Sequence, residues 1–224
     1  MFLSKVSLKQ GPELLALLGS KKGADGYAAH KLLWDLFPND GKKTRDFLFH
    51  KEERNGLPTF YLLSHEEPVS NPAFNLQTKP FSPKLSRGCR LAFTLIANPV
   101  VARKREGNRH SAKHDVWMDA KKQAKEKGLA EGELIEFCEN SVKEWLIRQG
   151  SRSGFEICKK EILIDGYLQN CFYKGKGIRP IRFSSIHFEG VLTVTDPDVF
   201  VAMLGKGLGK SKAFGCGLML IRRI

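Results

Sequence analysis

A segment rich in glycine and lysine near the C-terminus, Gly205–Gly217, constrains this chain more than any other stretch. Its thirteen residues hold five glycines and three lysines. Glycine lets the backbone adopt positive φ angles and approach another surface closely, and lysine provides a point charge suited to phosphate. The segment therefore predicts either a flexible turn with solvated lysines or a loop that binds a phosphodiester backbone through Lys206, Gly207, Gly209, Lys210, Ser211 and Lys212.

The same segment does not match a nucleotide-binding P-loop. That motif requires Gly-x-x-x-x-Gly-Lys-Ser/Thr after a strand and before a helix. Gly209-Lys210-Ser211 supplies the second half, but Leu204 occupies the position of the first glycine. The flanks are also reversed, because a helix-like pattern precedes the segment and a strand-like pattern follows it. The sequence therefore argues against an ATPase of this class.

The charge balance points to a polyanion as partner. Thirty-seven Lys and Arg residues against twenty-four Asp and Glu residues give a net charge of +13 and a pI near 9.6. This balance favours nucleic acid first and an anionic membrane second. The sequence contains no apolar run of the ~18 residues that a membrane span needs, and no lipidation motif. We therefore predict a nucleic-acid partner and no membrane association.

The cysteines and histidines give no sign of a metal or other cofactor. Five scattered cysteines form no Cys-x-x-Cys pair, so neither a disulfide framework nor a zinc ribbon is indicated. His110 and His114 have helical spacing but no evident third ligand. We therefore predict no metal and no cofactor, and the cysteine usage favours a reducing cytoplasm.

The order of apolar patterns predicts an α+β fold made of two repeats. The first half shows strand and helix patterns over Phe2–Val6, Tyr27–Phe37, Arg45–His50, Thr59–Ser64 and Phe74–Lys79, with a weak helix before the last strand. The second half repeats this order over Arg90–Val101, Val116–Lys127, Glu133–Gln149, Phe155–Ile164, Phe183–Thr195, Pro197–Leu204 and Leu218–Ile221. We predict two tandem ferredoxin-like (RRM-like) domains with antiparallel sheets, 1–83 and 88–224, and a C-terminal glycine-rich loop.

The helix predicted over Tyr27–Phe37 carries a candidate catalytic histidine. With about 100° per residue, its apolar residues fill one arc that faces the core. Tyr27, His30 and Trp34 lie just beyond one edge of this arc, and their spacing of three and four residues lets them touch. Histidine can transfer protons near neutral pH. His30 is therefore either a proton-transfer residue facing a groove or an ordinary surface or core histidine.

A basic segment over Arg148–Arg182 predicts an RNA-binding hairpin. Its lysines and arginines are interleaved with Phe172 and Tyr173. Duplex RNA is recognised largely by shape and by contacts to its backbone. The alternative is a solvated strand rim. The candidate RNA-binding residues in this stretch are Arg152, Lys159, Lys160, Lys174, Lys176, Arg179 and Arg182.

Several motifs together resemble one family. They are Met1–Val6, Leu-Trp-Asp-Leu-Phe-Pro at 33–38, Arg45–His50, Ala97–Pro99, Phe188–Thr193 and Gly207–Leu218. In these motifs the chain is similar to the CasE family of endoribonucleases, which process CRISPR repeat RNA within the Cascade surveillance complex. The resemblance runs from the first residue nearly to the last, and Phe188–Thr193 and the glycine-rich loop are its most specific parts.

The resemblance implies a function and a set of site residues. Members of the family have two ferredoxin-like domains, bind the stem-loop of precursor CRISPR RNA and cut at the 3′ base of the stem without metal. They then remain on the product together with the other Cascade subunits. The resemblance places the catalytic histidine at His30, a tyrosine three residues earlier at Tyr27 and a basic residue at Lys31. The family's basic hairpin corresponds loosely to Arg152–Arg182.

The residues suit metal-free RNA cleavage, in which the 2′-hydroxyl attacks the adjacent phosphate and leaves a 2′,3′-cyclic phosphate and a 5′-hydroxyl. His30 would transfer a proton as acid or base, Tyr27 would orient the reacting groups, and Lys31 or loop lysines would stabilise the added charge. Two alternatives stay open. One is an RNA-binding subunit of the same fold without activity. The other is a metal-dependent nuclease, which is weaker because the carboxylates of residues 115–144 alternate with lysines, as on a solvated face.

Overall fold

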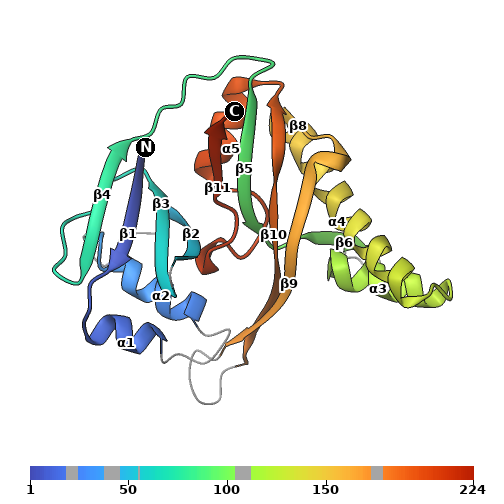
Figure 1. Cartoon of the computed structure of the whole chain (residues 1–224), viewed down its shortest axis with the longest axis horizontal. Helices are drawn as coiled ribbons and strands as arrows, with labels where there is room; N and C mark the ends of the chain where they lie inside the picture. Colours follow the sequence, from blue (N-terminus) through green and yellow to red (C-terminus); the bar gives the residue numbers. More distant parts are fainter. Residues whose placement is uncertain (19–24, 38–45, 55, 104–111, 173–178) are drawn as a thin grey trace.

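Two antiparallel sheets face each other in the computed structural model (Figure 1). The structure describes residues 1–18, 25–37, 46–54, 56–103, 112–172 and 179–224. The strands of the first sheet all precede residue 81, and the strands of the second sheet all follow residue 89. The division of the chain into domains 1–83 and 88–224 stays a prediction.

The first sheet has the strand order β2-β3-β1-β4. Its elements are β1 (Phe2–Leu8), α1 (Pro12–Leu18), α2 (Asp25–Trp34), β2 (Phe47–Arg54), β3 (Leu57–Ser64) and β4 (Phe74–Pro80). One face of the sheet packs on α2 through a core that includes Val6, Ala29, Leu33, Phe49 and Phe60. Ala29 and Leu33 belong to the apolar arc read from the sequence, because they recur at helical spacing on the buried side of α2.

The second sheet has the order β11-β5-β10-β8, and β9 also pairs with β10. Its strands are β5 (Arg90–Ala97), β8 (Phe155–Glu156), β9 (Ile162–Phe172), β10 (Ile181–Val194) and β11 (Met219–Arg223). The helices α3 (Val116–Glu126), α4 (Glu131–Arg152) and α5 (Pro197–Lys206) complete it, with the short hairpin β6 (Val100–Arg103) and β7 (Ala112–Asp115) and the 3-10 turns η1 (Lys159–Glu161) and η2 (Lys212–Phe214). The strand orders of both sheets confirm the prediction of two ferredoxin-like units.

Two predicted strands are interrupted. The strand predicted over Arg90–Val101 ends at Ala97 and resumes as β6, because Pro99 has no N–H for a ladder hydrogen bond. The strand predicted over Phe155–Ile164 is broken by η1, and β9 begins only at Ile162. There the carbonyl of Glu161 passes so close to Gly190 that a Cβ on that residue would lie 2.1 Å from the oxygen. The break therefore follows from a close approach of two backbone segments.

The helices of the first half also differ from the prediction. The leucine cluster within Gly11–Gly19, for which no element was predicted, forms α1 with Pro12 as its first residue, a position that proline favours. The weak helix predicted before β4 is wrong, because the described residues 65–73 between β3 and β4 form no helix. The first ferredoxin-like unit therefore lacks its second helix.

The two sheets are joined by a small apolar core. Leu48, Leu63 and Leu218 are buried there, and Leu3 and Leu220 pack against them. Leu218 directly follows the glycine-rich loop, so this contact ties the end of the chain to the first sheet. Across the parts of the chain that the structure describes, we find no helix with the length and apolar character of a membrane span.

Candidate active site

His30 lies on α2 at the border between the core and the domain interface. Its neighbour Ala29 is fully buried, whereas His30 itself is only partly buried. The indole Nε1 of Trp34 donates a hydrogen bond to Nε2 of His30 over 2.9 Å, and the two rings meet edge to face. The predicted contact between these two side chains is confirmed, since residues four apart lie on one helix face.

Aromatic side chains from both domains surround the imidazole. The ring centroid of His30 lies 6.2 Å from that of Phe47 on β2 and 6.4 Å from that of Phe214 on η2. Phe214 stacks in turn on Phe183 of β10, at 5.4 Å between centroids. The glycine-rich segment therefore reaches the histidine of the first domain, and the site is assembled from α2, β2, η2 and β10.

The glycines of the C-terminal segment let it pack closely against the first sheet. Gly215 has φ 83°, and a Cβ there would lie 2.9 Å from the ring of Phe49. Gly207 has φ 75°, and a Cβ there would lie 2.8 Å from Leu48. Gly207 is buried and its N–H donates to the carbonyl of Met203. The prediction that Gly207 binds RNA is therefore wrong, because its amide is already used and its surface is covered.

The polar residues of the segment divide into two groups. Ser211, at φ 56°, accepts a hydrogen bond from Asn98, and the ammonium of Lys212 donates to the carbonyl of Lys206. These contacts hold the loop in shape, which is a role that the sequence did not predict for Ser211 and Lys212. The side chains of Lys206 and Lys210 are exposed, and Gly209 is partly exposed. Contacts of this second group with RNA remain a prediction.

The other two candidate catalytic residues also lie on α2. Lys31 directly follows His30 and its side chain is exposed. The backbone of Tyr27 is helical, but its side chain lies outside the described residues. Lys31 therefore lies one position after His30 and about 100° further round the helix.

The basic residues predicted to form one RNA-binding surface lie at two ends of the second sheet. Arg179 and Arg182 are exposed at the turn end of β9 and β10, which lies on the same side of the molecule as α2 (Figure 1). Lys174 and Lys176 are outside the described residues. The other three described candidates lie beyond the opposite end of β9, and they are Arg152, Lys159 and Lys160. The eleven residues of β9, at ~3.3 Å each, separate the two ends of this strand by about 35 Å.

The prediction that all seven basic residues form one hairpin is therefore wrong. Arg152 ends α4, and Lys159 and Lys160 belong to η1. Lys159 also forms an ion pair with Glu144 on α4, with 3.3 Å between Nζ and Oε1. The sequence pattern over Phe155–Ile164 reads as one continuous strand, so it does not show that Lys159 and Lys160 belong to the 3-10 turn η1 and not to β9.

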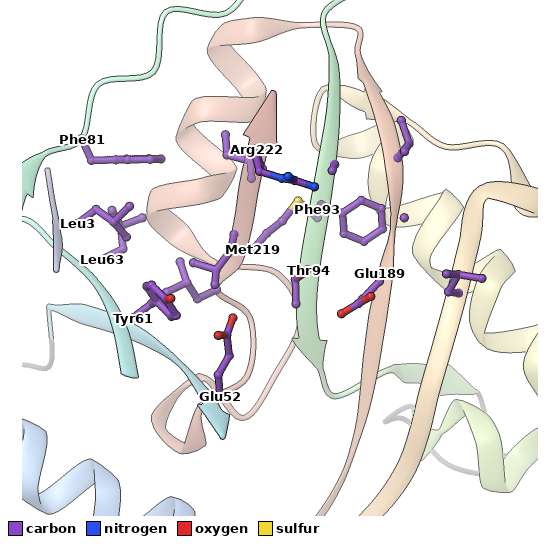
Figure 2. Close-up of a pocket in the computed structure, with 17 residues that line it drawn as sticks. Leu3, Glu52, Tyr61, Leu63, Phe81, Phe93, Thr94, Glu189, Met219 and Arg222 are labelled. Carbon is purple, nitrogen blue, oxygen red and sulfur yellow. The ribbon is translucent and has the colours of Figure 1, made fainter. Parts of the chain in front are cut away.

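The space between the two sheets is a separate cavity. It has a volume of about 620 Å³ and is lined largely by apolar side chains such as Leu63 and Met219. Figure 2 shows Glu52 on the side of the first sheet, and Thr94 and Glu189 on the side of the second. Carboxylates repel phosphate, and the two glutamates of the lining outnumber its one cation, Arg222, so the charges of this cavity disfavour an RNA backbone.

His50 lines a second cavity, together with His187, Glu52 and Glu189, and differs from His30. It lies on β2, is 1% exposed, and its ring centroid is 6.1 Å from that of His187 on β10. Burial lowers the pKa of His50 to about 4, opposed in part by the charge of Glu52. A histidine in this environment stays neutral near pH 7, which suits a structural role.

Sequence reasoning missed the aromatic residues of the site. Phe47, Phe183 and Phe214 lie on three separate elements, and none was a candidate. One signal could have revealed them, because Phe214 is a large apolar residue inside a segment of glycines and lysines. A fully solvated loop would not need such a side chain. Among the described residues, no group of three His, Cys, Asp or Glu side chains is placed to hold a metal ion.

Comparison with known proteins places the whole chain in one family. A family model described as "CRISPR associated protein" matches residues 1–223. The chain is 30% identical over 222 residues to the CRISPR system Cascade subunit CasE of Escherichia coli (strain K12), which covers 98% of each chain. It is also 30% identical over 151 residues to the CRISPR-associated endoribonuclease Cse3 of Thermus thermophilus, or 64% of this chain and 60% of the relative.

Solved structures agree with the fold. The crystal structure of the CRISPR-associated protein Cas6e from E. coli K-12 has a TM-score of 0.60, with 26% identity and full coverage of both chains. T. thermophilus Cse3 bound to an RNA representing a pre-cleavage complex has a TM-score of 0.69, with 22% identity, 99% coverage of this chain and 98% of that chain. The second similarity concerns the fold alone.

Proposed function

The chain belongs to the CRISPR-associated protein family, and on this premise we propose that it is a metal-independent endoribonuclease. It binds the stem-loop of CRISPR repeat RNA and cleaves precursor CRISPR RNA at the 3′ base of the stem. Relatives named as a Cascade subunit and as a CRISPR-associated endoribonuclease support this function. The RNA is held by the second domain and cut by a residue of the first.

One observation carries the proposal, namely the position of His30. Its ring lies where α2 meets η2, close to Phe214 of the glycine-rich loop. Exposed cations adjoin the site in the chain, because Lys31 follows His30 and Arg182 precedes Phe183, which stacks on Phe214. A phosphodiester bound there would have a proton-transfer group and positive charge next to it, which are the two requirements of the reaction.

The chemistry is an in-line attack within the RNA strand. The 2′-hydroxyl attacks the adjacent phosphorus, the bond to the 5′ oxygen breaks, and the products carry a 2′,3′-cyclic phosphate and a 5′-hydroxyl. His30 transfers a proton during this exchange, Tyr27 orients the reacting groups and Lys31 stabilises the added negative charge. These three residues of α2 form the proposed catalytic group.

Binding of the stem relies on charge and shape. We propose that Arg179, Arg182, Lys206, Lys210 and Gly209 contact the RNA, with Lys174 and Lys176 in the same hairpin. The net charge of +13 supports a polyanion partner. Each neutralised phosphate releases counterions, so binding weakens steeply as the salt concentration rises.

After cleavage we propose that the protein stays on the mature RNA as a subunit of Cascade, in contact with other subunits of that complex. The E. coli relative carries the name of such a subunit. We place the protein in the cytoplasm, because its five cysteines are all free and free thiols are typical of a reducing compartment.

The test is cleavage of the repeat hairpin from the protein's own genome. We expect the wild-type protein to cut once, at the 3′ base of the stem, in EDTA as well as without it. A 2′-deoxy nucleotide directly 5′ of the scissile phosphate should block cutting and leave binding unchanged. His30→Ala should bind the hairpin with the wild-type affinity and fail to cut. Loss of activity in EDTA would favour a metal-dependent nuclease, and normal cutting by His30→Ala would remove this residue from the mechanism.

The second candidate is an RNA-binding subunit without activity. It shares every binding prediction and differs in one result, because neither the wild-type protein nor His30→Ala would cut the hairpin. The half-buried ring of His30, with its hydrogen bond to Trp34, favours the enzyme, since a histidine that only coats the surface needs no such support.

A further inference from the structure

The hydrogen bond between Trp34 and His30 fixes how protons are arranged on the imidazole. An indole N–H can donate but cannot accept. Because Nε1 of Trp34 lies 2.9 Å from Nε2 of His30, Nε2 must offer its lone pair. The neutral ring therefore carries its proton on Nδ1, and an imidazolium, with hydrogens on both nitrogens, cannot accept this bond.

The two nitrogens of His30 also differ in how they can be reached. Nδ1 is buried, with less than 1 Å² of exposed surface. Nε2 faces the indole of Trp34, a side chain that is itself only partly buried. A hydroxyl group of a bound substrate can therefore meet the imidazole by taking the place of the indole N–H at Nε2.

The indole is held firmly in this position. Its ring meets that of Phe47 edge to face, at 5.6 Å between centroids, and Phe47 is only 3% exposed. Phe37 stacks on the same phenyl ring at 4.8 Å. Trp34 therefore rests on a packed aromatic support and does not depend on RNA for its orientation.

We propose that Trp34 is a positioning residue, which keeps His30 neutral with its lone pair on Nε2, so that His30 acts as the general base of the cleavage reaction once a substrate hydroxyl takes the place of the indole N–H. This inference rests on the proposed function and decides between the two roles that the sequence left open. A general acid would need a proton on Nε2, which is the state that Trp34 opposes.

The proposed step balances as follows. The proton of the 2′-hydroxyl moves to Nε2 of His30 while the 2′ oxygen forms a bond to phosphorus. The bond from phosphorus to the 5′ oxygen breaks, and this oxygen takes a proton from water. The imidazolium then returns its proton to solvent, and the N–H of Trp34 can bond to Nε2 again.

The first test reads the tautomer directly and needs no RNA. In the full-length protein labelled with ¹⁵N at histidine, the signals of His30 are identified by their loss in His30→Ala. We expect long-range ¹H–¹⁵N shifts of the neutral form with the proton on Nδ1. In Trp34→Phe, which keeps an aromatic ring and removes the N–H, we expect a change toward the Nε2–H form. An Nε2–H tautomer in the wild-type protein, or an identical pattern in the variant, would overturn the positioning role.

The second test reads the pH dependence of cleavage by Trp34→Phe. A donor to the neutral ring favours that form, so its removal should move the acid limb of the pH–rate profile to higher pH. At pH 7 we expect on the order of a tenfold lower rate with unchanged affinity for the hairpin. A shift of the alkaline limb instead would identify His30 as an acid, and an unmoved profile would overturn the proposal.

Two features make the second test specific. The charged residues on the elements around the ring include Lys31 on α2, Lys212 on η2, Arg182 on β10, and Lys51, Glu52 and Glu53 on β2, while Asp46, which precedes β2, pairs with His65. None of them changes in the variant. Trp117→Phe is the matched control, because this indole stacks on Tyr167 in the second domain, and its profile should equal that of the wild-type protein.

The catalytic role of His30 and the positioning role of Trp34 can be disproved separately. If His30→Ala cuts normally, the proposed role of His30 in catalysis fails, and the assignment of a general base fails with it. The ¹⁵N experiment would still decide whether Trp34 sets the tautomer. If His30→Ala is inactive and Trp34→Phe behaves as the wild type in both tests, only the inference about Trp34 is wrong.

Discussion

Two histidines of the first domain face the second domain, and their surroundings differ. His30 is partly exposed and receives a hydrogen bond from Trp34. Its ring lies near Phe214, which stacks on Phe183, and the chain neighbours Lys31 of His30 and Arg182 of Phe183 are exposed cations. His50 is 1% exposed and lies beside a cavity that carries the carboxylates of Glu52 and Glu189. The same interface therefore has a region of cations and aromatic rings around His30, and a region of carboxylates around His50.

The two regions separate the proposed catalytic role of His30 from the stabilising role of His50 within one interface. Phosphate is attracted to the first region and repelled by the second. Burial lowers the pKa of His50 to about 4, so that this residue stays neutral while the protein works near pH 7. His50 is a packing residue that a proton would disturb, whereas the proposed role of His30 is to exchange protons with a ligand.

The largest expected effect is a loss of cleavage that only one histidine shows. We expect His30→Gln to lower the cleavage rate of the repeat hairpin by roughly 10²–10⁴-fold, the usual contribution of general acid–base catalysis. His50→Gln should cut at nearly the wild-type rate at neutral pH and moderate temperature. Single-turnover rates with both variants would check this, and equal losses would show that the comparison between the two regions is wrong.

The second effect concerns stability and belongs to His50. The pKa of His50 is about 4 in the folded protein and 6.5 ordinarily. Between these values the unfolded chain binds a proton that the folded chain does not. The stabilisation is therefore complete above pH 6.5 and is lost as the pH falls toward 4, by about 3 kcal/mol for this group.

Chemical denaturation of the wild-type protein and His50→Gln, at pH values from 7 to 4, measures this effect. The difference in free energy of unfolding between the two proteins should shrink as the pH falls, because only the wild-type protein carries the histidine. If the difference in free energy of unfolding stays constant between pH 7 and 4, His50 takes up a proton in the folded state as readily as in the unfolded chain. Its ring would then not be shielded from solvent as its burial indicates.

The third effect tests how the glycine-rich loop supports the region around His30. Gly215→Ala places a Cβ 2.9 Å from the ring of Phe49 at a φ of 83°. We expect a loss of about 2 kcal/mol in the free energy of unfolding, together with slower cleavage, because the adjacent Phe214 moves relative to His30. Gly132→Ala is the control, since no atom lies within 4 Å of its added Cβ, and its stability should stay equal or rise slightly.

Local features of this site could be predicted from the sequence because they depend on residues close in the chain. The four-residue spacing of His30 and Trp34 on a helix predicted their contact, which the structure shows at 2.9 Å. The pattern over Pro197–Leu204 is likewise observed as α5, whose start is capped by Asp196, because its carboxylate accepts from the N–H of Val199. Such short spacings fix which side chains meet before any tertiary structure is known.

The parts of the site and of the fold that the sequence did not predict depend on contacts between distant segments. Phe214 reaches His30 only because Gly215 lets the loop approach β2, and no pattern within the loop reveals that approach. The strand alternation before Ile162 looked continuous, although the carbonyl of Glu161 passes against Gly190 and ends it. The sequence of a segment shows whether it is apolar or glycine-rich, but it does not show which other segment of the chain it packs against.

The smallest expected effect concerns RNA affinity and separates the two ends of β9. Arg182→Ala, at the end near His30, should weaken binding of the hairpin several-fold and lower the slope of log K against log salt by about 1, the loss of one phosphate contact. Arg152→Ala, at the far end, removes the same charge and should change neither quantity. Binding measured at several salt concentrations distinguishes the two, because a general loss of net charge would affect both variants alike. An equal loss for both would mean that the RNA follows the whole length of β9, so that the region around His30 would not be the place where phosphate is concentrated.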